Sequence, residues 1–257
     1  MKILQTAERV SDTNQSDNFV FQRSLLAYHY AKTMVNGNTL EVGSGEGYGL
    51  RILSGGCQSY TMLDKYVFDP KKLEGFPNTK FIQTEVPPFK GIADNTYDFV
   101  VSFQVIEHIK DDALFVQEIQ RVLKPGGVFL ATTPNIKMSL ARNPWHIREY
   151  TIQELESLLL KSFKSVKKNG VYAGPKAMEY YEKNKESVNK IMRFDVFKLQ
   201  HKLPRWMLQI PYDLLNRMNR KKLLKKNEAL TSHLKTEDFY IDEAKDNCLD
   251  LFFISTK

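Results

Sequence analysis

The fold is decided by the stretch Leu40-Glu41-Val42-Gly43-Ser44-Gly45-Glu46-Gly47-Tyr48-Gly49. It joins the end of an apolar strand to an acidic residue and four alternating glycines. Glycine permits positive φ and has no Cβ, so a bulky ligand can lie directly against the backbone. The stretch therefore predicts a strand-to-helix turn that binds a nucleotide-like cofactor. A glycine-rich turn without a ligand is the alternative.

The spacing of these glycines narrows the class of ligand. A dinucleotide-binding Gly-x-Gly-x-x-Gly that began at Gly43 would need a glycine at position 48, where the chain has Tyr48. No lysine followed by Ser or Thr occurs here, which excludes a phosphate-cradling P-loop. The spacing thus departs from both the dehydrogenase and the kinase patterns.

Strand-like and helical runs alternate around this turn, which predicts an α/β fold with a parallel sheet and helices on both faces. Helices are expected within residues 17–36 and 111–123, and Thr151 with Glu154 forms a capping box that opens another. The expected strands are residues 39–42, 60–63, 80–82, 97–103, 128–133, 163–172 with a break near Asn169-Gly170, and 249–255.

The 257 residues, 42% of them hydrophobic, favour one domain spanning 1–257. Residues 174–247 are helix-prone and basic, and they are too long for a plain connection. We interpret them as an insertion that acts as a lid or substrate-binding subdomain.

The positive charge is concentrated in that insertion. Residues 201–226 contain eight Lys or Arg and one acid, so their net charge is +7, the same as that of the whole chain. Such a local patch indicates an anionic substrate or surface rather than general nucleic-acid affinity. Within this basic segment, residues 203–215 combine large apolar side chains with positive charges on either side. We favour a helical cap packed on the core over weak membrane-surface contact.

The remaining composition excludes several classes. Cys57 and Cys248 lie far apart, which argues against a disulfide framework or a structural zinc site. The chain begins without a long apolar run, and no segment reaches the roughly 18 apolar residues of a membrane span. A cytoplasmic location is expected, and the sequence does not indicate an oligomeric state.

The glycine turn is similar to the first motif of the class I S-adenosylmethionine-dependent methyltransferases, an acid-x-Gly-x-Gly-x-Gly turn after the first strand. The resemblance continues through residues 95–109 and 123–127. It implies a Rossmann-like, seven-stranded, mostly parallel sheet with an antiparallel last strand and a helical insertion before it. The cofactor-binding residues that it implies are Glu41, Gly43, Ser44, Gly45, Gly47, Tyr48, Asp64, Lys65, Glu85, Phe103 and Gln104.

The resemblance also gives some of these residues roles. Asp64 lies 21 residues after Gly43, where an acid can accept both hydrogen bonds of a ribose diol. Glu85 is placed to contact the adenine amino group or to be a solvated loop acid. Phe103 and Gln104 would lie beside the methionine part of S-adenosylmethionine.

Methyl transfer is a displacement at an activated carbon, so a base is needed only for a hydroxyl or a protonated amine acceptor. His108 and His146 are the candidate catalytic bases. His108 alternatively orders its turn. Trp145, Arg148 and Tyr150 are the candidate substrate contacts, with Arg148 as an anion clamp or as a structural ion pair with its neighbour Glu149.

The sequence thus predicts transfer of a methyl group from S-adenosylmethionine to an oxygen, or secondarily a nitrogen, of a small-molecule or glycan-linked acceptor, including anionic ones. Two alternatives stay open: an RNA methyltransferase and a non-catalytic cofactor-binding scaffold. Nucleic acid is disfavoured because no RNA-binding module and no Asn-Pro-Pro-Tyr tetrad is present. No metal is expected, since no His and carboxylate cluster has ligand spacing.

Overall fold

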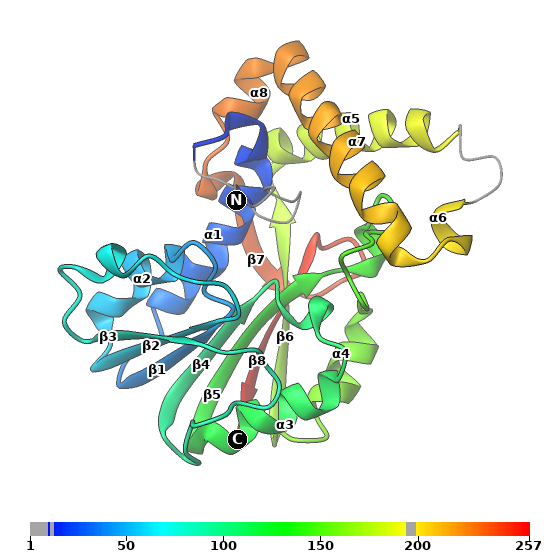
Figure 1. The fold of residues 1–257 in the computed structure, drawn as a ribbon. Coiled ribbons are helices and arrows are strands. Elements are labelled where there is room, and N and C mark those ends of the chain that lie inside the picture. The colour runs from blue at the N-terminus through cyan, green and yellow to red at the C-terminus, as the bar shows by residue number, and fades with distance from the viewer. Residues whose placement is uncertain (1–9, 11–12, 194–198) are drawn as a thin grey trace.

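The computed structural model describes residue 10, residues 13–193 and residues 199–257. An eight-stranded sheet with the order β3-β2-β1-β4-β5-β8-β6-β7 forms its centre (Figure 1). β1 to β5 pair in parallel, and β8 runs antiparallel to both β5 and β6. The mostly parallel sheet with an antiparallel last strand is confirmed. The strands are β1 (Asn38–Val42), β2 (Ser59–Asp64), β3 (Thr79–Gln83), β4 (Tyr97–Phe103), β5 (Leu123–Pro134), β6 (Ser165–Ala173), β7 (Phe239–Glu243) and β8 (Asp250–Thr256).

Two details of the predicted sheet are wrong. The sheet has eight strands rather than seven, because β7 pairs with the outer edge of β6 from within the segment expected to be helical. β7 is short and largely exposed, so its hydrophobic pattern is weak. The expected break at Gly170 is absent, since β6 continues there and pairs with β8. A Cβ at Gly170 would lie 2.4 Å from that of Cys248, so this glycine permits close packing instead.

Helices cover both faces of the sheet (Figure 1). α1 (Asn18–Lys32) and α2 (Tyr48–Leu53) share one apolar cluster with β2, and α3 (Asp112–Val122) and α4 (Ile152–Leu159) share another with β1 and β5. The predicted capping box is confirmed at α4, where the Thr151 and Glu154 side chains each accept the other's backbone N–H.

In the described part of the chain, four α-helices follow the end of β6: α5 (Pro175–Met192), α6 (Leu199–Lys202), α7 (Arg205–Lys226) and α8 (Glu228–Ser232). α5 and α7 pack on α1 through a third cluster that includes Phe19, Tyr180 and Leu223. An ion pair of 2.8 Å between Arg220 and Asp17 joins α7 to the N-terminal segment. Within the described residues, no helix combines the length and apolarity needed to cross a membrane.

Candidate active site

The parallel strands β1 to β5 place their carboxyl ends along one edge of the sheet, where α/β folds bind ligands. The strand order fixes what lies along this edge. The segment after β3 is followed by Asp64 at the end of β2, then by the glycine turn after β1, and then by Gln104 after β4. An extended ligand on this edge would meet these groups in that order.

The glycine turn has the conformation that its sequence predicts. Gly43, Gly45 and Gly47 have φ of 80°, 51° and 83°, a region that side chains other than glycine rarely adopt. Added Cβ atoms at Gly43 and Gly47 would strike Val105 and Phe68, so these two glycines are required for packing. A Cβ at Gly45 would meet nothing within 4 Å, and the residue is exposed. Gly45 therefore faces an open space against the backbone.

Asp64 is linked directly to this turn. Its carboxylate accepts hydrogen bonds from the backbone N–H of Gly45 at 2.8 Å and of Tyr66 at 2.9 Å. The side chain remains partly exposed. A hollow next to Asp64 is lined by Lys65, Tyr66, Gln83, Thr84 and Glu85. Asp64 thus lies between the glycine turn and this hollow, and the predicted residues Lys65 and Glu85 form part of its wall.

Glu41 lies beneath the turn rather than on its surface. The side chain is 1% exposed, and its carboxylate accepts hydrogen bonds from the Tyr28 hydroxyl at 2.7 Å and the Tyr60 hydroxyl at 2.8 Å. Burial raises the pKa of Glu41 to about 7, although the two hydroxyls lower it in part. Glu41 therefore supports the turn from inside the core.

The other predicted cofactor residues divide between core and surface. Phe103 is buried against Tyr28, and Tyr48 opens α2 with its ring edge-on to that of Phe21. Ser44 is buried, and its hydroxyl has no hydrogen-bond partner among the described residues, which leaves a polar group at the turn for a ligand. Gln104 has a φ of 58° and donates its side-chain amide to Thr132. Strain at a non-glycine residue of this kind is typical of functional sites.

A cavity of about 340 Å³ lies beyond Gln104, between the sheet edge and the helices that follow β6. Its size suits a small ligand or part of a larger one. The sheet side is polar and includes Gln104, Glu107, His108, His146 and Glu149. The helical side carries apolar residues, among them Val188, Ile191, Met192 and Leu215, and also the polar residues Asn184, Asn216, Asn219 and Arg220.

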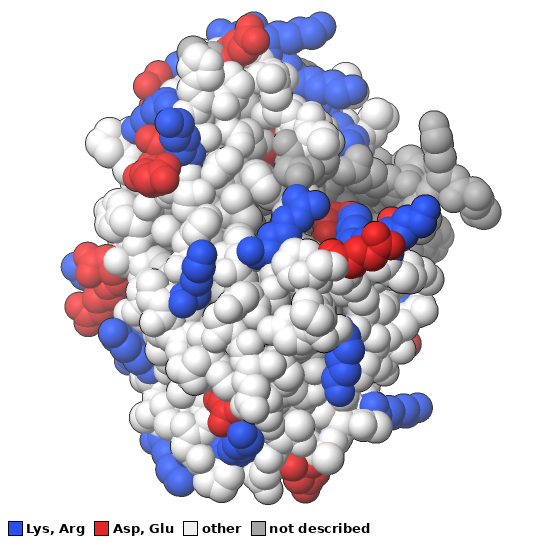
Figure 2. Space-filling model, turned by 90° about the vertical axis from the view of Figure 1, so that its left-hand side faces the viewer, with Lys and Arg blue, Asp and Glu red and all other residues white. Residues whose placement is uncertain are grey.

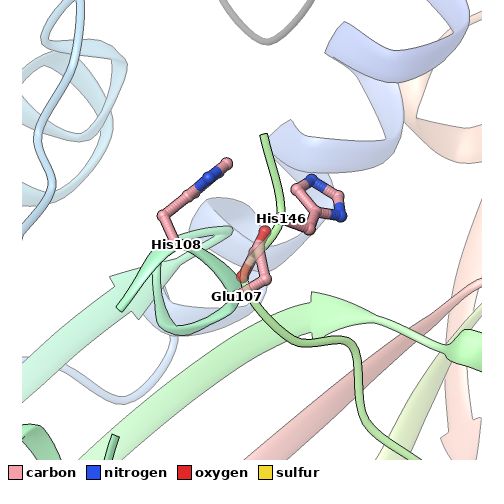
Figure 3. Close-up of side chains that lie close together, drawn as sticks. All are labelled: Glu107, His108 and His146. Carbon is pink, nitrogen blue, oxygen red and sulfur yellow. The ribbon is translucent and has the colours of Figure 1, made fainter. Parts of the chain in front are cut away.

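Three titratable side chains meet in this cavity. Figure 3 shows Glu107 between His108 and His146, and one potential ligand atom of each lies within 4.8 Å of the others. The two imidazole rings are 5.0 Å apart, edge to face. Glu107 is buried and accepts a hydrogen bond from the Thr133 hydroxyl at 2.9 Å. The fold thus brings both predicted bases to one place.

Hydrogen bonds orient both histidines. His108 Nδ1 lies 3.0 Å from the Trp145 carbonyl, which only accepts, so Nδ1 carries the hydrogen and Nε2 is the basic nitrogen. Asn143 accepts from the Trp145 backbone N–H, which directs its amide N–H toward His146 Nε2 at 2.8 Å. His146 Nδ1 then donates to Glu149 at 2.6 Å. His146 is thereby held between a carboxylate and an amide.

The predicted substrate contacts lie elsewhere. The Trp145 indole donates to Asp213 on α7 at 3.1 Å. Tyr150 is fully buried, and its hydroxyl donates to Asp112 at 2.8 Å. Arg148 pairs with Asp112 at 3.1 Å and Glu154 at 3.5 Å, rather than with its neighbour in sequence. None of these three residues lines the cavity.

Sequence reasoning missed three residues of the site: Glu107, Asn143 and Glu149. Glu107 was visible as an acid next to His108, directly after a buried strand. The expectation of no metal considered spacing along the chain, whereas Glu107 and His146 are brought together only by the fold.

Comparisons with known proteins agree with this geometry. Residues 40–131 match the family model of a methyltransferase domain. A probable S-adenosylmethionine-dependent methyltransferase of Mycobacterium tuberculosis is 33% identical over 182 residues, covering 66% of this chain and 65% of its own length. One of Mycolicibacterium smegmatis is 36% identical over 161 residues, covering 60% and 62%. The chain thus spans less than two thirds of the length of these relatives.

Solved structures share the fold. A possible histamine N-methyltransferase of Thermotoga maritima aligns with a TM-score of 0.54 at 15% identity, covering 93% of this chain and 92% of its own. A Haemonchus contortus N-methyltransferase, solved with S-adenosylhomocysteine, aligns at 0.53 and 18% identity, covering 92% of this chain and 53% of its own.

The fold and the sheet edge define a class I methyltransferase architecture. Residues 40–131 thus match a methyltransferase domain, and the chain is similar over part of its length to probable S-adenosylmethionine-dependent methyltransferases.

Proposed function

We propose that this chain transfers a methyl group from S-adenosylmethionine to an oxygen of a small-molecule or glycan-linked acceptor bound in the cavity beneath α5 and α7. The observation that carries the proposal is the continuity of the sheet edge. It runs from Asp64 and the open face of Gly45, past Gln104, into the cavity that holds His108.

The residues of this edge fit the cofactor. Asp64 can accept hydrogen bonds from a ribose diol, the buried Ser44 hydroxyl has hydrogen-bonding capacity to offer, and Gly45 leaves space against the backbone. Bound there, S-adenosylmethionine supplies the activated methyl group. The chain's own contribution is to orient the acceptor and to exclude water.

The oxygen acceptor is supported by the orientation of His108. Its hydrogen bond to the Trp145 carbonyl leaves Nε2 as the nitrogen that can take the proton of an acceptor hydroxyl. His146, held by Glu149 and Asn143, acts as a positioning residue beside it. The mixed walls of the cavity suit an acceptor with an apolar part and a polar part.

The test is a panel of nucleotide sugars, lipid-linked glycans and small phenols, with release of S-adenosylhomocysteine as the readout and NMR to identify the methylated atom. His108→Gln should lower kcat about 100-fold with an unchanged Kd for S-adenosylmethionine. His29→Gln, at an exposed histidine on α1, is the matched control.

Cofactor binding without turnover on any acceptor would instead support a scaffold protein. Turnover that is insensitive to His108→Gln would contradict its role as the base. RNA binding with a steep salt dependence, accompanied by RNA methylation, would replace the proposed acceptor.

A further inference from the structure

The outward face of α7 is apolar where a helix at the surface is normally polar. Trp206, Ile210, Leu214 and Met218 are 71%, 80%, 60% and 59% exposed. They are spaced four residues apart, so they lie on one side of the helix. Met207 is exposed beside them. We call Trp206, Met207, Ile210, Leu214 and Met218 the apolar stripe.

The inward face of the same helix carries three hydrogen-bonded polar side chains. Asn219 is buried and hydrogen-bonds with Ser187 at 2.6 Å and Asn184 at 2.7 Å on α5. Arg220 pairs with Asp17, and Asp213 accepts the Trp145 indole N–H. Residues 206–218 therefore leave exposed the large apolar side chains that we expected to pack on the core, whereas Leu223 near the end of α7 is buried in the third cluster.

Basic residues continue the outward surface toward the end of α7. Lys221, Lys222, Lys225 and Lys226 are exposed, and none of them has an ion pair within the described part of the chain. The one acid of α7, Asp213, is turned inward. The exposed surface of this helix thus combines apolar side chains with positive charge and presents no carboxylate.

Charged side chains are distributed differently outside the helical segment that contains α7. Figure 2 shows one face of the molecule, on which Lys, Arg, Asp and Glu are interspersed and separated by uncharged surface. An extended basic band, as nucleic acid would need, is not seen on that face. The unbalanced charge belongs to the helical segment.

We propose that α7 docks onto an anionic membrane surface. Its apolar stripe would enter the boundary between headgroups and acyl chains, with Trp206 at the interface, and the lysines would contact acidic headgroups. We choose an anionic membrane as the partner because a bilayer with acidic lipids complements both the apolar stripe and the positive charge of this one helix.

Docking would also place the cavity next to the membrane. Leu215 of α7 lines the cavity and is exposed as well, so the docking helix forms part of the cavity wall. An acceptor carried on a lipid could then reach His108 from the membrane. This consequence rests on the proposed methyl transfer, whereas docking itself does not.

The test is co-sedimentation of the full chain with vesicles of phosphatidylcholine alone and of phosphatidylcholine mixed with phosphatidylglycerol. We expect sedimentation with the mixed vesicles that high salt reduces. Ile210→Ser with Leu214→Ser, and separately Lys221→Gln with Lys225→Gln, should each weaken it about tenfold. Leu160→Ser, at an exposed leucine after α4, is the matched control and should bind as the parent chain does.

These substitutions are on the surface, so circular dichroism and an unchanged unfolding midpoint should show that the fold is retained. Absence of sedimentation with mixed vesicles, or an equal loss with Leu160→Ser, would overturn the proposal. A dimer by light scattering that Ile210→Ser with Leu214→Ser dissociates, without vesicle binding, would assign the stripe to a second copy. Vesicle binding needs neither cofactor nor acceptor, so its failure is distinguishable from failure of the methyl transfer.

Discussion

The buried carboxyl of Glu41 makes the stability of the ligand-free protein depend on pH in a calculable way. Its pKa is raised from a usual value of 4.5 to about 7, mainly because burial disfavours the charged form. In the unfolded chain the group ionises near its usual value. The folded state thus holds the proton more tightly than the unfolded state does.

The sign follows from this difference. Below pH 4.5 the carboxyl is protonated in both states, and its stabilising contribution is fully present. Between pH 4.5 and 7 the unfolded chain ionises first, so the free energy of unfolding falls by about 1.4 kcal/mol per pH unit. Above pH 7 both states are ionised, and the total loss levels off at about 3 kcal/mol.

The assay is urea unfolding of the parent chain and of Glu41→Gln from pH 4.5 to 8.5, without cofactor. Subtracting the two free energies of unfolding removes the pH dependence of all distant groups. We expect the difference, parent minus variant, to fall by about 3 kcal/mol across this range. A difference that stays constant would refute the argument that the Glu41 carboxyl is desolvated.

The tyrosines give a second check. The Tyr60 hydroxyl stabilises the ionised form of Glu41, so Tyr60→Phe should raise the pKa of Glu41 further and extend the loss to higher pH. Tyr97→Phe changes a buried tyrosine that makes no hydrogen bond to Glu41, and the pH range of the loss should not move.

Three further outcomes are expected. Gly45→Ala should weaken S-adenosylmethionine binding at least tenfold by calorimetry, whereas Gly75→Ala, also at positive φ with open space, should cost a similar ~1 kcal/mol of stability and leave binding unchanged. Trp145→Phe removes the indole hydrogen bond to α7, so hydrogen exchange in residues 205–226 should accelerate while cofactor affinity is retained. Gly170→Ala should destabilise by roughly 2 kcal/mol in urea unfolding, because its Cβ has no room beside the Cys248 side chain; an unchanged midpoint would contradict that packing.

Local signals account for what the sequence predicted well. Positive φ at Gly43, Gly45 and Gly47 follows from their spacing, and the capping box at Thr151 depends on residues three apart. The position of Asp64 at the end of β2 follows from the length of an apolar run. Each of these features is set by a few consecutive residues, so no knowledge of the sheet order is needed.

The composition of the cavity could not be predicted in the same way. Glu107 and His146 meet because the segments after β4 and β5 leave adjacent strands of the sheet, which no periodicity along the chain encodes. Arg148 was a candidate anion clamp because it lies beside aromatic residues in sequence. Its carboxylate partners, Asp112 and Glu154, come from the start of α3 and from α4, and only the packing of these helices brings them near.

The side chains of α7 show that an amphipathic pattern alone does not determine which face of a helix turns toward the core. Burying an apolar side chain such as Ile210 or Leu214 stabilises a protein by roughly 1.5–3 kcal/mol, yet α7 leaves both exposed. The hydrogen bonds of Asn219 on the inward face stabilise the fold by about 1 kcal/mol each. Folding stability by itself would therefore favour the opposite orientation of these side chains. An outward apolar stripe beside exposed lysines is better explained by what α7 binds than by how the chain folds.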